Sequence, residues 1–575
     1  MAEHELVIRD GTVVDGSGRP SRVADVAVSG GVVTEVGRVD GRGRREIDAD
    51  GHLVFPGFVD IHTHYDGQAT WDQQLAPSSW HGVTTVVAGN CGVGFAPVVP
   101  ENHERLIQLM EGVEDIPGVA LHEGLSWNWQ TFGEYLDEID RLPRDIDFAT
   151  HLPHGALRLH VMGERGAARE PATADDIAAM AIIAEQAARD GAIGFSTSRT
   201  LNHRSSLGEL TPSLTAEADE LIGIAKGLAR GGQGVLQVVS DFIEVDGEFE
   251  MLQQMAAESG LPLSISVVQS NSEPAKWREL LDRCLEAQAA GVTMRGQVGT
   301  RAVGLLMGHL GTLSPFMGSS LYRELADLAH AERMVRMAQP EVKATILEEL
   351  AVRRETAVLG EGMTGRFQFM YPLGDPPDYE PDPASSVGNV ARSLGREPAE
   401  YAYDLLLEGD GRSFFYMPLL NYRGGNLDVV REQLLHPAAV PGLSDGGAHV
   451  GTICDVSFPS TLLQYWGRDR TDGRIPVETL VHKQSRATAE TVGLLDRGLI
   501  APGYKADLNV LDFAAMKLRA PEMHYDLPAG GRRLLQRVEG YRHTFVNGAE
   551  VVADGTSTGE TPGALVRGQR SAPIG

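Results

Sequence analysis

The chain has 575 residues, 42% of them apolar, and a formal net charge of −29 at pH 7. This length predicts about two to four domains with a large core, and the excess of acidic residues argues against nucleic acid or an anionic membrane as a partner. The three cysteines are too few for a disulfide framework, and we find neither a signal-peptide h-region nor an apolar run of about 18 residues, so we expect a cytoplasmic protein without a membrane span.

The two ends of the chain share a strand-like pattern. Residues 1–55 alternate apolar and polar side chains between Gly and Asp turns, as in "ELVIRDGTVVDG", and similar stretches return within residues 497–575, as in "YRHTFVNGAEVVADG". Alternation with a period of two is typical of strands that bury one face. We therefore expect the two ends to build one small composite β-sandwich.

The middle of the chain, residues 56–496, alternates strands and helices. The expected strands are 58–62, 82–89, 146–152, 191–198, 234–241, 261–269, 291–298 and an eighth within "VPGLSDGGAHVG" (440–451). Eight such strands separated by helices predict an α/β fold, the (β/α)8 TIM barrel, whose active site lies at the carboxyl ends of the strands. A helical insert at about 303–436 precedes the last strand and is expected to form a lid or an oligomer contact.

The first barrel strand ends in "HTHYD" (62–66). His62 and His64 are two residues apart, so on a strand both imidazoles project to the same side and can chelate one metal ion. Asp66 follows them at the mouth of the barrel. A His-x-His taken alone is often accidental, so the prediction depends on what other strands bring to the mouth.

Two other strand ends carry candidate ligands. Cys91 in "AGNCGVG" ends the second strand, where a thiolate would bind zinc well, although a buried, inert cysteine is the alternative. Asp445 in "LSDGGAH" ends the eighth strand, where a carboxylate can bind a metal and exchange a proton with water, although Asp is also an ordinary turn former. His449 is either a partner of this site or a loop histidine.

Several motifs resemble the amidohydrolase superfamily, and specifically its D-aminoacylase (N-acyl-D-amino-acid deacylase) branch. They run through the whole chain: "DGTVVDGSG", "PGFVDIHTHYD", "GVTTVVAGNCG", "GAIGFSTS", "LSDGG" and "RGLIAPGYKADLNVLD". The resemblance implies a metal-dependent hydrolase in which His62 and His64 are ligands, Cys91 replaces the superfamily's carboxylated lysine, and Asp445 is the catalytic carboxylate. No lysine precedes Lys226, so the first four barrel strands cannot supply the carboxylated lysine.

The chain also departs from this branch. D-aminoacylases and most relatives place a histidine at the ends of strands five and six, but no histidine occurs here between His203 and His309. Gln237 and Gln269 stand near those positions, and amide oxygens are poorer zinc ligands than imidazole. We therefore predict one ion, Zn2+ first, with iron or manganese as alternatives. Its expected ligands are His62, His64, Asp445 and Cys91.

Substrate contacts are expected on the loops after strands three to six. "THLPHGALR" (150–158) resembles a family segment that faces the pocket, and "STSRTLNHRSS" (196–206) follows strand four, where the family tends to hold the substrate's carboxylate. Basic loop residues are otherwise usually solvated. The candidates are His154, Arg199, His203, Arg204, Gln237, Asp241, Gln269 and His449. Trp127 and Trp129 either line an acyl pocket or pack in the core, and Cys284 is expected to be structural.

These features together predict hydrolysis of the amide of a small N-acylated, D-configured amino acid, with Asp445 as general base and acid. The first alternative keeps the scaffold but acts on a cyclic amide or runs another reaction, because the strand-five and strand-six histidines are missing. The second alternative is a barrel that binds a small molecule without catalysis. The expected partner is a small-molecule substrate, and the long insert and acidic surface are compatible with a homo-oligomer.

Overall fold

The computed structural model describes residues 2–232, 234–353 and 365–574. Its centre is an eight-stranded parallel sheet in which each strand lies beside its predecessor in the barrel. The strands are β6 (Phe58–Asp60), β7 (Val83–Ala88), β8 (Asp147–Pro153), β9 (Gly194–Arg199), β10 (Val235–Ser240), β11 (Leu263–Ser266), β12 (Met294–Val298) and β16 (Ala439–Pro441). All eight fall within or beside the predicted ranges, in the predicted order.

The curled sheet closes just beyond its two end strands. Thr63, after β6, forms a parallel bridge with Gly446, after β16. Two backbone hydrogen bonds flank the bridge: Asp445 N–H donates to His62 O at 3.1 Å, and His64 N–H donates to Gly446 O at 2.7 Å. The predicted TIM barrel is confirmed, and the seam that closes it joins the His-x-His segment to Asp445.

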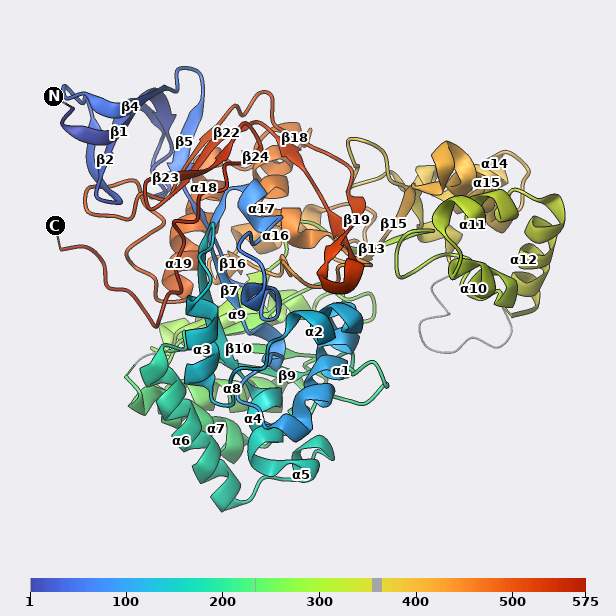
Figure 1. The fold of residues 1–575 in the computed structure, drawn as a ribbon, viewed down its shortest axis with the longest axis horizontal. Coiled ribbons are helices and arrows are strands. Elements are labelled where there is room, and N and C mark those ends of the chain that lie inside the picture. Colours follow the sequence, from blue (N-terminus) through green and yellow to red (C-terminus); the bar gives the residue numbers. More distant parts are fainter. Residues whose placement is uncertain (1, 233, 354–364, 575) are drawn as a thin grey trace.

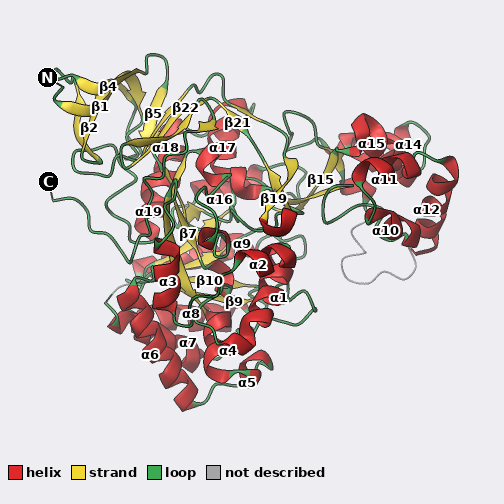
Figure 2. Cartoon of the chain, in the orientation of Figure 1, coloured by secondary structure: helices red, strands yellow, loops and turns green. Residues whose placement is uncertain are grey.

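Helices surround this sheet (Figures 1 and 2). They are α1 (His103–Glu114), α2 (Gly118–Gly124), α3 (Phe132–Asp140), α4 (His154–Met162), α5 (Glu164–Ala167), α6 (Ala174–Asp190), α7 (Ala218–Arg230), α8 (Val245–Ser259), α9 (Lys276–Ala289), α16 (Asp428–Leu435), α17 (Phe458–Thr461), α18 (Val477–His482) and α19 (Thr488–Thr491). The longest, α6, begins at a capping box between Thr173 and Asp176 and ends at Gly191, whose φ of 119° suits glycine.

Both ends of the chain build one nine-stranded sheet, at the upper left of Figure 1. It contains β1 (His4–Val13), β2 (Arg22–Ser29), β3 (Val32–Gly37), β4 (Gly43–Asp48), β5 (Leu53–Pro56), β17 (Leu508–Leu511), β22 (Tyr541–Val546), β23 (Ala549–Ala553) and β24 (Thr556–Ser557). Antiparallel pairing of β5 with β17 joins the two ends. The two ends therefore share one sheet, while the bounds 1–55 and 497–575 of a composite β-sandwich stay a prediction. The last segment leaves it, however, and Phe148 of β8 bonds through its backbone to Ala564 and Val566.

Two short hairpin-like pairs lie between β17 and β22. They are β18 (Lys517–Leu518) with β21 (Val538–Glu539), and β19 (Glu522–Leu527) with β20 (Gly531–Leu535). Leu534 N–H in β20 donates to Val450 O at 2.7 Å. The carboxyl-terminal part of the chain therefore reaches the loop that carries Asp445.

The insert forms a body with its own apolar core, at the right of Figures 1 and 2. It contains β13 (Val303–Gly308), β14 (Tyr371–Pro372), β15 (Phe414–Leu420), α10 (Ser320–Ala326), α11 (His330–Met337), α12 (Pro340–Arg353), α14 (Val387–Ser393) and α15 (Pro398–Leu407). Residues 354–364 of the predicted insert lie outside the described residues. Its role as a lid or oligomer contact stays a prediction. No helix among the described residues has the length and apolar character needed to cross a bilayer.

A buried ion cluster fastens the β-domain to the barrel. The Asp147 carboxylate at the start of β8 lies 2.6 Å from Arg497 Nη1 and 2.9 Å from Lys505 Nζ, and it also accepts the Ala564 N–H at 3.0 Å. Burial alone would raise the pKa of Asp147, but Lys505 and Arg497 lower it to about 2. Its folded-state pKa is therefore below that of the unfolded chain, so the carboxylate stabilises the fold above pH 4 and loses this contribution between about pH 4 and 2.

Replacing Asp147 by Asn is expected to lower the free energy of unfolding by about 1–3 kcal/mol, because Arg497 and Lys505 each lose one of two carboxylate partners and keep Asp496 and Asp507, respectively. Urea denaturation at neutral pH measures the loss, and repeating it at pH 3 should show a smaller difference between variant and wild type. Asp512→Asn, which breaks the more exposed pair with Arg542, is the control and should change stability by less than about 1 kcal/mol. Equal effects of the two substitutions would contradict the anchoring role of Asp147.

Candidate metal centre

His62 and His64 follow β6 at the mouth of the barrel, and both are almost completely buried. Gln297 of β12 places Oε1 2.7 Å from His62 Nδ1. Because an amide oxygen can only accept, Nδ1 carries the proton and Nε2 keeps its lone pair. That Nε2 lies 3.3 Å from Cys91 Sγ and 3.4 Å from Asp445 Oδ1, while His64 Nε2 lies 3.7 Å from the same Oδ1.

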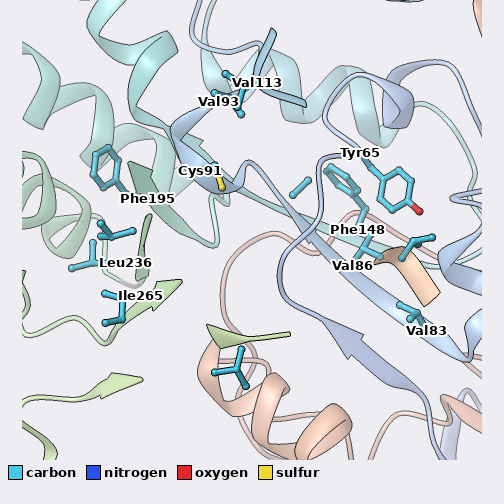
Figure 3. Close-up of a cluster of buried hydrophobic side chains, with 14 of the residues drawn as sticks. Tyr65, Val83, Val86, Cys91, Val93, Val113, Phe148, Phe195, Leu236 and Ile265 are labelled. Atoms are coloured by element: carbon cyan, nitrogen blue, oxygen red, sulfur yellow. The ribbon is translucent and has the colours of Figure 1, made fainter. Parts of the chain in front are cut away.

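Cys91 reaches the site from a loop of unusual backbone conformation. The residue has φ of 56°, in the left-handed region that non-glycine residues seldom adopt. Gly92 beside it has φ of 67°, and a side chain there would meet the backbone of Thr197 at 2.9 Å. Figure 3 shows Cys91 in the cluster of buried apolar side chains to which Val93 and Val113 also belong. Burial and the nearby carboxylates raise the pKa of the thiol well above its usual value.

Asp445 also stands in the left-handed region, with φ of 50°. Ser444 beside it donates its hydroxyl to the buried Asp60 carboxylate at 2.5 Å, which ties the loop back to β6. Burial alone would raise the pKa of Asp445, but His64, His62 and His449 together hold it well below its usual range. The carboxylate is therefore ionised at neutral pH and can accept a proton.

Further buried carboxyl groups lie around this cluster. Glu114, at the end of α1, is 1% exposed, and burial together with Asp445 and Asp66 raises its pKa well above the usual range. Asp66 is equally buried, accepts the Gly89 N–H at 3.1 Å, and has a pKa raised to about 7, mainly by burial. Buried carboxyl groups at this density lack a balancing cation among the described side chains.

The residues present fit a divalent metal ion. One donor atom each of His62, His64 and Cys91 lies within 4.8 Å of the other two, and Asp445 adds an oxygen. Nitrogen, sulfur and oxygen donors in this combination are those that zinc prefers, and a bound cation would lower the pKa of the thiol and balance the acidic groups. His64 Nδ1 and Glu114 Oε1 are buried 3.3 Å apart, and within the described residues neither atom has a hydrogen bond of full geometry, so Nε2 is the nitrogen of His64 that faces the other donors.

Three of the predicted substrate contacts lie near this cluster. Gln237 Oε1 accepts the Cys91 N–H at 2.9 Å. His203 Nδ1 lies 3.0 Å from Ser198 Oγ, and burial, with His449 and His64 nearby, lowers its pKa to about 3. His449 Nε2 is 3.6 Å from Glu114 Oε2. Two of these residues, His203 and His449, therefore bring further imidazoles close to the proposed metal position.

Two other predicted contacts are already engaged elsewhere. His154 is fully buried, with Nδ1 at 2.8 Å from Thr197 Oγ1 and Nε2 at 2.9 Å from Glu220 Oε1. Arg199 forms an ion pair with Glu248 at 2.5 Å and a second bond to that carboxylate. Both side chains are therefore engaged by other residues of the chain, and their contact with a substrate stays a prediction.

The remaining candidates lie in loops or in the core. Gln269 bonds through its side chain to Pro274 O and Arg423 N, and Asp241 accepts the Thr200 hydroxyl at 2.6 Å. Arg204 Nη1 donates to Gly208 O at 3.0 Å. The aromatic and sulfur-containing candidates pack in the protein: Trp127 stacks on His103, Trp129 donates to Phe95 O, and Cys284 and Cys454 are buried.

Sequence analysis missed three buried polar residues at this site. Glu114 lies on the same buried face of α1 as Met110 and Val113, so a polar residue within an apolar pattern was the available signal there. Gln297 lies in β12, whose sequence MRGQV has no apolar pattern that would have marked it as buried. His151 of β8 is buried with Nδ1 unpartnered, and burial, together with His62, lowers its pKa to about 3. Its strand is buried on both faces, so no alternation marked it.

Known proteins resemble this chain in sequence and in fold. The model of the amidohydrolase family matches residues 45–552. The D-aminoacylase of Alcaligenes xylosoxydans xylosoxydans is 27% identical over 570 residues, which cover 98% of this chain and 97% of that enzyme. A D-aminoacylase structure from a study of its binuclear metal centre superposes with a TM-score of 0.65 at 24% identity, covering 98% of this chain and 100% of that one. The N-acyl-D-glutamate deacylase of Bordetella bronchiseptica, complexed with zinc and a phosphonate inhibitor, gives a TM-score of 0.62 at 21% identity, covering 98% and 99%.

Proposed function

The chain belongs to the amidohydrolase family, in its D-aminoacylase-like branch. We therefore propose that it hydrolyses the amide of a small N-acylated amino acid, and that it prefers the D enantiomer. Membership of this family establishes the coarser statement, that the protein is a metal-dependent hydrolase of amide bonds. The observation that carries the finer proposal is the convergence of His62, His64, Cys91 and Asp445 at the closing seam of the barrel.

In this proposal one divalent ion is held by His62, His64, Cys91 and Asp445, and Zn2+ is the preferred candidate. When bound, the ion polarises the substrate carbonyl and lowers the pKa of water. A single ion is supported by the chemistry of the neighbouring strands: Gln237 of β10 uses its amide oxygen on the Cys91 N–H, and β11 carries no imidazole.

Asp445 is the proton carrier of the proposed reaction. Its carboxylate is ionised at neutral pH, so it can accept a proton from the attacking water and return it to the leaving nitrogen. The Nε2 atoms of His62 and His64 lie 3.4 Å and 3.7 Å from this carboxylate, so an ion bound by the two imidazoles would also hold Asp445 in place. His203 and His449, which lie beside the cluster, are the groups we propose for contact with the polar part of the substrate.

Metal analysis and a substrate panel test the proposal. We expect about one equivalent of divalent metal per purified chain and turnover of N-acyl-D-amino acids faster than of their L enantiomers. Cyclic amides belong in the same panel, because preferential opening of a cyclic amide would replace our substrate class while keeping the metal site. A chain that takes up no metal and cleaves neither class would instead favour a small-molecule-binding barrel. Sedimentation of the same sample tests the expected homo-oligomer.

A further inference from the structure

A buried carboxylate lies between two imidazoles at the edge of the proposed metal site. Glu114 Oε1 is 3.3 Å from His64 Nδ1, and Glu114 Oε2 is 3.6 Å from His449 Nε2. The Glu114 side chain is 1% exposed, and within the described ranges neither of its oxygens has a hydrogen-bond partner that meets full geometry. Burying a carboxylate without partners is unfavourable, so its position needs a reason.

His64 faces this carboxylate and Asp445 with opposite sides of its ring. Nε2 lies 3.7 Å from Asp445 Oδ1, while Nδ1 points toward Glu114 and has no other partner among the residues described. A ligand histidine in a metalloprotein almost always donates its far N–H to a carboxylate, carbonyl or amide, which fixes the ring and makes the ligating nitrogen more basic. His62 already has such an acceptor in Gln297, at 2.7 Å.

We propose that Glu114 is the positioning residue of His64: its carboxylate accepts the Nδ1–H, so that Nε2 is held toward the metal, and its second oxygen receives His449. This inference rests on the proposed function, because it presumes that His64 is a ligand. It adds a carboxylate from α1 to a site whose other members come from strand ends and from the loops that follow them.

The backbone supports this assignment independently of the side chain. The Glu114 carbonyl accepts the His449 N–H, and Asp115, next in the chain, accepts the Gly451 N–H at 3.2 Å through its side chain. The end of α1 is therefore fastened to the loop that carries Asp445 by bonds that a change at the Glu114 side chain leaves intact. A Glu114→Gln variant should keep the loop and lose only the negative charge facing the two imidazoles.

The test compares metal affinity in wild type, Glu114→Gln and Glu104→Gln, by chelator competition with Zn2+. Glu104 lies on the same helix but is exposed, so its variant is the matched control. We expect about a 10–100-fold loss of affinity in a further variant, Glu114→Leu, which has no acceptor for the Nδ1–H, a smaller loss in Glu114→Gln, whose amide oxygen can still accept it, and no change in Glu104→Gln. Thermal unfolding of the metal-free proteins should be similar, which separates positioning from a general loss of structure.

If the substitutions at Glu114 disturb folding, a second measurement still tests the proposal. In the Co2+-loaded protein, each ligand histidine gives one exchangeable, paramagnetically shifted N–H signal, and Glu114→Asp, which shortens the carboxylate, should speed the exchange of one signal but not the other. Unchanged affinity in Glu114→Leu, or unchanged exchange in Glu114→Asp, would overturn this inference alone. Wild-type protein that takes up no metal would overturn the proposed function and the inference together.

Discussion

Replacing Asp445 by Asn is expected to lower kcat by at least about 10²–10⁴-fold while leaving most of the metal in place. This decrease in kcat has the size expected for the loss of general acid–base catalysis, because the Asn amide cannot accept the proton of water and return it to the leaving nitrogen. His62, His64 and Cys91 still supply three ligand atoms within 4.8 Å of one another. Steady-state kinetics and metal analysis of the same preparation measure the two effects separately.

Asp145→Asn is the matched control for this experiment. Asp145 is also a buried carboxyl group, and its Oδ1 accepts the backbone N–H groups of Leu75 and Ile146, which an Asn oxygen can accept as well. We expect this variant to keep both metal and turnover. An Asp445→Asn enzyme with wild-type kcat would remove Asp445 from the proposed mechanism.

Replacing His62 by Asn is expected to remove the metal and, with it, all measurable turnover. Its Nε2 lies within 3.4 Å of both Cys91 Sγ and Asp445 Oδ1, so it is the donor nearest to the other proposed ligands. Loss of a ligand should reduce the metal affinity more than loss of a group that only orients a ligand, which typically costs about 10–100-fold. Metal content after dialysis, measured by atomic emission, shows the result.

His81→Asn separates this effect from damage to the barrel. His81 is as buried as His62, but its two nitrogens bond to Ser460 Oγ at 2.8 Å and Gln536 O at 3.1 Å, away from the proposed ligands. We expect His81→Asn to lose stability and keep its metal. If His62→Asn retained one equivalent of metal, the assignment of the His-x-His pair as ligands would be wrong.

The barrel followed from the sequence because its signals are local. Apolar strands, helices with caps and the turns between them are short-range patterns, and each of the eight strands was found within or beside its range. The composite β-domain was predicted for the same reason. Short apolar strand segments occur around Val7 and Ile8 and again around Val510, and β5 and β17 complete one sheet.

The substrate contacts were less predictable, because they depend on partners far away in the sequence. Arg199 looked free to bind a carboxylate, but Glu248 of α8 occupies it. His154 looked like a pocket residue, but Glu220 of α7 and Thr197 of β9 hold both of its nitrogens. Long-range ion pairs and hydrogen bonds of this kind leave no periodic trace in the chain.

By itself the sequence determined the family, the barrel and the residues proposed as metal ligands, His62, His64, Cys91 and Asp445, since residue type and position relative to a strand end are local properties. Only the tertiary structure decided how they meet. The seam between Thr63 and Gly446 brings the first and last strands together, and the left-handed backbone at Cys91 and Asp445 turns both side chains inward. Tertiary packing alone can hold residues in that conformation, and it also placed Gln297 and Glu114 against the two histidines.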